Sequence, residues 1–144
     1  MGRDGESTDR ALAMQHLDLL QGAIDRIGGQ SFLIKGWNVT LATAIGGFSV
    51  KEGGASVAAL ALIPILLLWW LDAYYLSLER SFRSLFKAAA QVVVAGGTPT
   101  LDMTPTVHIP TVFRNSFRPA VVMVHLPLLL LMVALAFGLF PTPS

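Results

Sequence analysis

The feature that most constrains the fold of this chain is the apolar stretch at residues 55–76, ASVAALALIPILLLWWLDAYYL, which has no charged residue before Asp72. The hydrocarbon core of a bilayer is about 30 Å thick, and a helix crosses it with about 20 mainly apolar residues. A second stretch, residues 118–140, has no charged residue after Arg118. Both stretches therefore predict transmembrane helices.

A third apolar stretch, residues 32–50, is a weaker candidate because Lys35 and Asn38 interrupt it. Composition agrees with a membrane protein: 53% of the residues are hydrophobic and 13% are charged, against about 25% charged in soluble domains. We predict an all-α membrane protein with three transmembrane helices. In the alternative, residues 32–50 form an interfacial helix and only two helices cross.

The distribution of positive charge predicts the orientation of these helices. Lysine and arginine residues in short loops favour the cytoplasmic side of a bacterial inner membrane. With three spans, nine of the ten such residues lie on one side, and only Lys51 lies on the other. The N-terminus is therefore expected in the cytoplasm and the C-terminus outside. Residues 32–50 are not expected to be a cleaved signal peptide, because a long amphipathic segment precedes them.

Residues 1–30 are expected to form an amphipathic cytoplasmic helix that begins near Thr8 and ends at Gly28 and Gly29. Its apolar residues recur at steps of three and four, as in a helix seam, at Leu17, Leu20, Ile24 and Ile27. Acidic residues outnumber basic ones, which favours a protein helix over an anionic lipid surface as the partner. The seam fits packing within one protomer or between protomers.

Residues 77–117 are expected to continue the second span into the cytoplasm and then to form a connector. The second helix carries a similar seam at Leu71, Tyr75, Leu78, Phe82 and Leu85. The connector is rich in threonine and proline, and its β-branched residues predict short strands at 92–94 and 106–113.

Three basic residues of this cytoplasmic helix, Arg80, Arg83 and Lys87, share one face. Two interpretations of this face are open: a solvated surface beside anionic lipid headgroups, or a site for an anionic ligand or partner.

Four polar residues lie at or inside the predicted spans: Lys35, Asn38, Asp72 and His125. Such residues normally face a partner helix or a water-filled space. Asp72 lies among boundary aromatic residues and is expected within reach of water, and Lys35 is expected to extend to the boundary. For His125 the alternatives are a side chain that extends to the boundary or bonds a carbonyl, and a proton-relay or pore-lining role.

The first apolar stretch also carries small residues at helical spacing: Gly36, Thr40, Thr43, Ala44 and Gly47. Small residues let membrane helices approach closely, and threonine can hydrogen-bond across the contact. We therefore expect a homo-oligomer. No catalytic motif is present and the three histidines are dispersed, so we expect no enzyme, catalytic residue, cofactor or metal. Nucleic-acid binding is not expected, because the basic residues are few and membrane-adjacent.

The residues SFLIKGWNVTL at 31–41 and LDAYYLSLERSFR at 71–83 resemble a family of small bacterial inner-membrane proteins with S-F-x-x-K-G-W-x-x-T-L and L-D-A-Y-Y-L-x-x-E-R-x-F-R motifs. In size and layout, that family resembles the transmembrane effectors of anti-phage defence systems. The resemblance implies a membrane-perturbing or pore-forming effector that responds to a cytoplasmic signal. It carries over no catalytic or ligand-binding residue.

We therefore predict four segments: a cytoplasmic amphipathic helix (1–30), a transmembrane hairpin (31–76), a cytoplasmic extension with its connector (77–117), and a third transmembrane helix with a short tail (118–144). Two functions are open. The first is an oligomeric effector assembled through its cytoplasmic helices. The second is a non-conducting anchor or accessory subunit that docks a cytoplasmic partner protein. Membrane lipids and a small anionic signal are the other expected partners.

Overall fold

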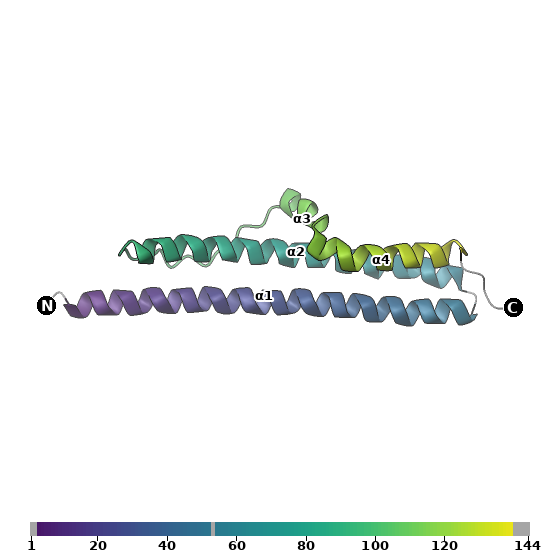
Figure 1. Cartoon of the computed structure of the whole chain (residues 1–144), viewed down its shortest axis with the longest axis horizontal. Helices are drawn as coiled ribbons and strands as arrows, with labels where there is room; N and C mark the ends of the chain where they lie inside the picture. The colour runs from purple at the N-terminus through teal and green to yellow at the C-terminus, as the bar shows by residue number, and fades with distance from the viewer. Residues whose placement is uncertain (1–2, 53, 140–144) are drawn as a thin grey trace.

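The computed structural model describes residues 3–52 and 54–139, and within these ranges the chain is helical with no strand. Two long antiparallel helices, α1 (Arg3–Glu52) and α2 (Ala55–Val94), form an elongated hairpin (Figure 1). The short helix α3 (Ile109–Ser116) leads into α4 (Pro119–Ala136), which lies along the half of the hairpin nearest the turn. The predicted all-α fold is confirmed.

Helix α1 is continuous over 50 residues, so the predicted start near Thr8 and the predicted end at Gly28 and Gly29 are wrong. A glycine inside a helix costs only about 1 kcal/mol relative to alanine. Ile24, Ile27 and Ile34 are buried on either side of these glycines, and that packing favours continued helix. At 1.5 Å per residue, α1 is about 75 Å long.

Helix α2 also runs without a break, and it contains Pro64 in its interior. The predicted strand at 92–94 is wrong, because these residues form the last turn of α2. The predicted strand at 106–113 is wrong as well, because α3 begins at Ile109. Pro110 lies in the first turn of α3, where the missing amide hydrogen breaks no helical hydrogen bond.

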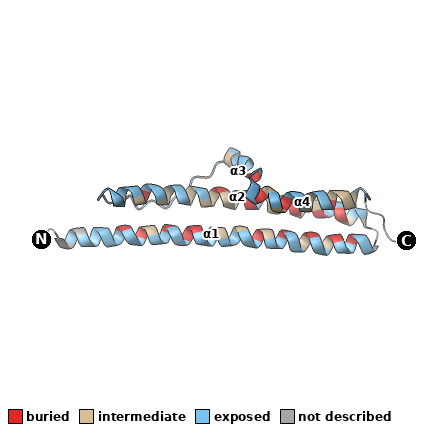
Figure 2. Cartoon of the chain, in the orientation of Figure 1, coloured by how far each residue is buried: buried red, intermediate tan, exposed pale blue. Residues whose placement is uncertain are grey.

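Near the hairpin turn, α1, α2 and α4 pack around a small apolar core formed by Ala42, Ala61, Ile65 and Met132. The two alanines let the helix backbones approach closely. Gly46 serves the same purpose, because a Cβ there would lie only 3.0 Å from the Met132 side chain. The buried faces of the long helices point toward each other along the hairpin (Figure 2).

Two described helices, α2 and α4, are long and apolar enough to cross a membrane. Helix α1 is not among them, so this criterion supports two spanning helices rather than the three predicted. The reason is local: Lys35 and Asn38 interrupt the apolar stretch of α1.

The half of the hairpin away from the turn, residues 3–30 and 77–94, is called the distal rod below. Here the predicted seam residues of α1 pack within the protomer: Leu20 has no exposed surface, Ile24 and Ile27 are buried, and Leu17 is half-buried. On α2, the half-buried seam residues are Tyr75, Leu78, Phe82 and Leu85. The remaining seam residue, Leu71, lies outside the distal rod and is 40% exposed.

Candidate functional site

Five polar side chains from three helices meet inside the hairpin, at the level where α4 packs against it. They are Ser31, Lys35 and Asn38 of α1, Asp72 of α2 and His125 of α4, and we call them the polar cluster. Asn38, Asp72 and His125 have no exposed surface. The side-by-side packing of α1, α2 and α4 therefore brings together residues that are far apart in the sequence.

The carboxylate of Asp72 is the centre of the polar cluster. Its Oδ1 accepts hydrogen bonds from Ser31 Oγ at 2.5 Å and from Lys35 Nζ at 2.7 Å. Its Oδ2 lies 3.1 Å from Nε2 of His125. Lys35 Nζ also donates to Ser31 Oγ at 2.9 Å. Asp72 and Lys35 thus form an ion pair. Ser31 bonds both members of the pair, and His125 contacts the second carboxylate oxygen.

The His125 ring is held between an acid and an amide. Its Nε2 faces Asp72, and its Nδ1 contacts the amide nitrogen of Asn38. An amide nitrogen only donates, so Nδ1 accepts and the proton of the neutral ring lies on Nε2. Trp69 stacks on the ring at a centroid distance of 6.1 Å and an interplanar angle of 14°. With a neutral imidazole, the charges of Lys35 and Asp72 cancel.

The polar cluster contains one buried polar atom whose hydrogen-bonding capacity is unused. Asn38 Oδ1 is buried and has no hydrogen-bond partner in the part of the chain that the structure describes. A half-turn of the amide would bring this oxygen, in place of the amide nitrogen, to Nδ1 of His125.

The geometry of the cluster does not match nucleophilic catalysis. An activated serine needs a free base beside its hydroxyl. Here the Ser31 hydroxyl donates to Asp72, and the Lys35 ammonium that contacts Ser31 is itself paired with Asp72. The described residues also contain no group of three or more histidine and acidic side chains that could hold a metal. What the arrangement can do is hold three helices together.

The four polar residues singled out from the sequence therefore lie together, but three of them have partners or surroundings that differ from those expected. Asp72 is fully buried rather than within reach of water. Lys35 turns inward to Asp72 instead of extending to the boundary, and its side chain is 23% exposed. His125 bonds a carboxylate rather than a backbone carbonyl. Sequence analysis missed Ser31, although its spacing of four residues from Lys35 places both on one face of α1.

The predicted basic face of α2 is divided between different partners. Arg83 forms an ion pair with Glu79 at 2.6 Å, and Lys87 is exposed. Arg80 instead approaches α3, where its Nη1 lies 3.5 Å from Oδ1 of Asn115. Sequence analysis missed α3, so this contact was not expected.

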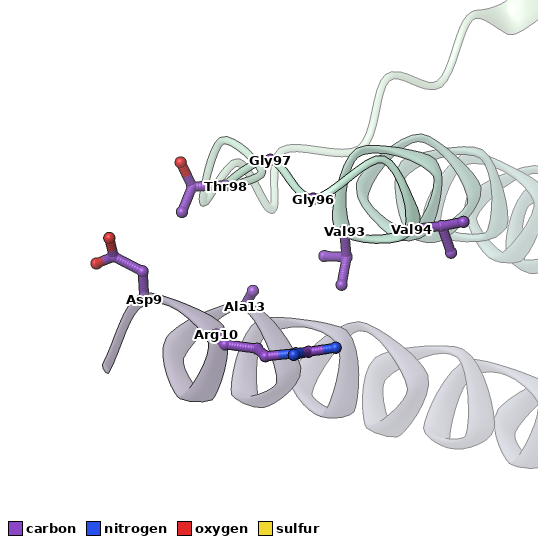
Figure 3. Close-up of a pocket in the computed structure, with 8 residues that line it drawn as sticks. All are labelled: Asp9, Arg10, Ala13, Val93, Val94, Gly96, Gly97 and Thr98. Atoms are coloured by element: carbon purple, nitrogen blue, oxygen red, sulfur yellow. The ribbon is translucent and has the colours of Figure 1, made fainter. Parts of the chain in front are cut away.

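A cavity of about 380 Å³ lies at the tip of the distal rod (Figure 3). Its walls come from the first turns of α1, with Asp9 and Arg10, and from the end of α2 and the turn that follows it. Gly96 makes this turn with a φ of 79°, which is favourable for glycine. The cavity offers both an acidic and a basic group, and sequence analysis did not point to it.

Comparison with known proteins found no matching family model, no matching curated protein and no matching solved structure.

Proposed function

We propose that the protein is a small oligomeric membrane effector, in which the distal rod lies in the cytoplasm and controls a membrane-embedded part that perturbs or opens the bilayer. The observation that supports this best is the closed polar cluster. It joins α1, α2 and α4 through charged groups that are neutral as a set. Separation of these helices would expose an acid, an amine and an imidazole at membrane depth, where such groups attract water.

The continuous helices supply a route from a signal to the cluster. Helices α1 and α2 each run without a break from the distal rod to the cluster and on to the hairpin turn. A helix transmits a shift or rotation along its axis, so a partner or small anionic signal bound at the tip would move the cluster residues. This coupling fits an effector that is silent until triggered.

We further propose that residues 32–50 of α1 cross the membrane as a third helix, with the N-terminus in the cytoplasm of a bacterial cell. These residues lie beside α2 and α4, the two apolar helices. Their outward face is apolar and large, with Phe32 77% exposed and Trp37 62% exposed. Such a face is unfavourable in water and favourable against lipid.

Assembly is proposed to use the small residues of this segment. Gly36, Thr40, Thr43, Ala44 and Gly47 are all exposed on the protomer, and a Cβ at Gly36 or Gly47 would meet no atom within 4 Å. This face is open to the close approach of a second α1 helix, in the manner of small-residue membrane contacts.

The double variant Gly36→Leu/Gly47→Leu is expected to reduce the protein from a multimer to the 15.4 kDa protomer, because two bulky side chains would hold the helices apart. Native mass spectrometry of nanodisc-embedded protein measures this directly. The matched control is Gly22→Leu/Gly29→Leu, which adds the same side chains at exposed, open positions of α1 outside the apolar stretch. If both double variants give the same assembly mass, the small-residue face of α1 is not the interface between protomers.

Expression in a bacterial host tests the effector function. We expect induction of the wild-type protein to arrest growth and to collapse the membrane potential, measured with a voltage-sensitive dye. The assembly-deficient Gly36→Leu/Gly47→Leu variant should retain most of the potential at equal membrane abundance. The Gly22→Leu/Gly29→Leu control should act like wild type. An unchanged potential with abundant wild-type protein would contradict the effector function.

The second candidate is a non-conducting anchor that docks a soluble partner. One observation favours it: the seam of the distal rod is already used inside the protomer, with Leu20 fully buried. The rod therefore does not need a second copy to cover its apolar face. A stable one-to-one complex with a cytoplasmic protein, without loss of membrane potential, would support the anchor.

A further inference from the structure

Three arginines gather where α3 meets α2 and α4. Arg118 Nε donates to Oδ1 of Asn115 at 3.1 Å, and Arg80 Nη1 lies 3.5 Å from the same oxygen. Asn115 is fully buried, and its amide nitrogen donates to Ser77 Oγ at 2.8 Å. The Asn115 amide is thus held by Ser77, and its oxygen faces the guanidinium groups of Arg80 and Arg118. Arg114 lies in the last turn of α3, within electrostatic range of Arg80.

The positive charge of these arginines is only partly offset, because Glu79 acts on Arg80 electrostatically but is itself paired with Arg83. The ion pairs among the described residues involve Lys35, Arg83 and His125, and none involves Arg80, Arg114 or Arg118. Partial burial, together with Arg118 and Arg114, lowers the pKa of the Arg80 guanidinium. Like charges at close range raise each other's energy, so a bound anion would stabilise the group.

An apolar groove of about 230 Å³ lies beside these arginines, toward the hairpin turn. Its lining residues are Leu66, Trp69, Trp70, Phe113, Ser116 and Phe117. Trp69 Nε1 donates to the Ser116 carbonyl oxygen at 2.9 Å, which fixes one wall. Phe113 and Phe117 form the other wall in an edge-to-face contact at 5.3 Å. Trp70 precedes Arg80 by ten residues of α2, which is about 15 Å along the helix axis.

We call the three arginines and the adjoining groove the arginine corner. We propose that the arginine corner binds one anionic glycerophospholipid, with its phosphate on Arg80, Arg114 and Arg118 and an acyl chain in the groove. The order of the two parts matches a lipid, because the groove lies on the apolar side of α2 and the arginines on the polar side. Arginine suits phosphate because its planar group donates two parallel hydrogen bonds. A phosphocholine headgroup would bind less tightly, because its own positively charged choline group is repelled by the arginines. This inference relies on the membrane placement in the proposed function.

Tryptophan quenching by brominated lipids tests the site. Trp37 is replaced by phenylalanine, which leaves Trp69 and Trp70, both in the groove, as the emitters. In vesicles of unlabelled phosphatidylcholine, a small fraction of brominated phosphatidylglycerol should quench more strongly than the same fraction of brominated phosphatidylcholine. The Arg80→Gln/Arg118→Gln variant should lower the preference for phosphatidylglycerol by about 25-fold, at about fivefold for each arginine.

The control variant Arg83→Gln/Lys87→Gln removes the same charge from the exposed part of α2 and should keep the preference. Equal quenching by both lipids, or equal losses in both variants, would overturn the specific site. Displacement of brominated phosphatidylglycerol by millimolar glycerol phosphate would mean that the corner takes a free phosphate instead. No quenching by either lipid would refute the membrane placement and this site together, whereas a lipid preference without any effector activity would leave this site standing.

Discussion

Replacement of Asp72 by alanine is expected to lower the free energy of unfolding by about 3–5 kcal/mol, the usual cost of removing one partner of a buried charge pair. Asp72 bonds Ser31, Lys35 and His125 with one fully buried carboxylate. Its loss leaves an ammonium group and a serine hydroxyl without their acceptor in the centre of the three-helix contact. Thermal unfolding in detergent, followed by circular dichroism, measures the change.

Asp18→Ala is the control, because Asp18 is an exposed aspartate of the same chain, and it should change stability by less than about 0.5 kcal/mol. Lys35→Met/Asp72→Leu/His125→Leu should recover most of the loss, because apolar side chains can replace a buried charged set without net cost. If this triple variant is stable but no longer depolarises cells, the cluster serves function rather than stability. A similar result for Asp72→Ala and Asp18→Ala would contradict the buried ion pair.

Replacement of Leu20 by aspartate is expected to open the distal rod at a cost of about 4 kcal/mol or more, since it both removes a buried leucine and buries a charge. Leu20 has no exposed surface, whereas its neighbour Leu19 is 52% exposed. The same substitution at Leu19 is therefore the matched control and should have little effect. Hydrogen–deuterium exchange should rise in residues 13–27 and 78–89 for the Leu20 variant alone.

The same experiment separates two packing arrangements of the seam. If Leu20 packs within the protomer, its replacement increases exchange at any protein concentration and leaves the multimer mass unchanged. If the seam joined protomers, the multimer would dissociate instead. Equal exchange in the Leu19 and Leu20 variants would contradict the burial of Leu20 between α1 and α2.

The general architecture was accessible from local patterns in the sequence. A long α2 was predicted from the apolar stretch at 55–76 and from the seam that follows it. The structure has this helix from Ala55 to Val94. The break at Gly28 and Gly29 and the strands of the connector were wrong, because local propensity was overridden. Burial of the isoleucines around Gly28 and Gly29 maintains α1, and the connector forms α3 with Pro110 in its first turn.

The candidate sites were harder to predict because they depend on contacts between distant residues. Lys35, Asn38, Asp72 and His125 were each recognised as unusual in an apolar setting, but nothing local shows that they share one cluster. Their separation is 37 residues for Lys35 and Asp72 and 53 residues for Asp72 and His125. The contacts among Arg80, Asn115 and Arg118 depend on α3. No periodic pattern in the sequence predicted this helix.

The unbroken length of α1 has an electrostatic consequence. If the bilayer boundary lies near Ser31, as the proposed placement implies, Asp9 and Arg10 at the tip lie about 33 Å farther along the helix. At physiological ionic strength the Debye length is about 8 Å, so the potential of anionic lipids falls to almost nothing before it reaches the tip. Binding at the tip should then be independent of lipid composition, whereas binding at Arg80, Arg114 and Arg118 should depend on it.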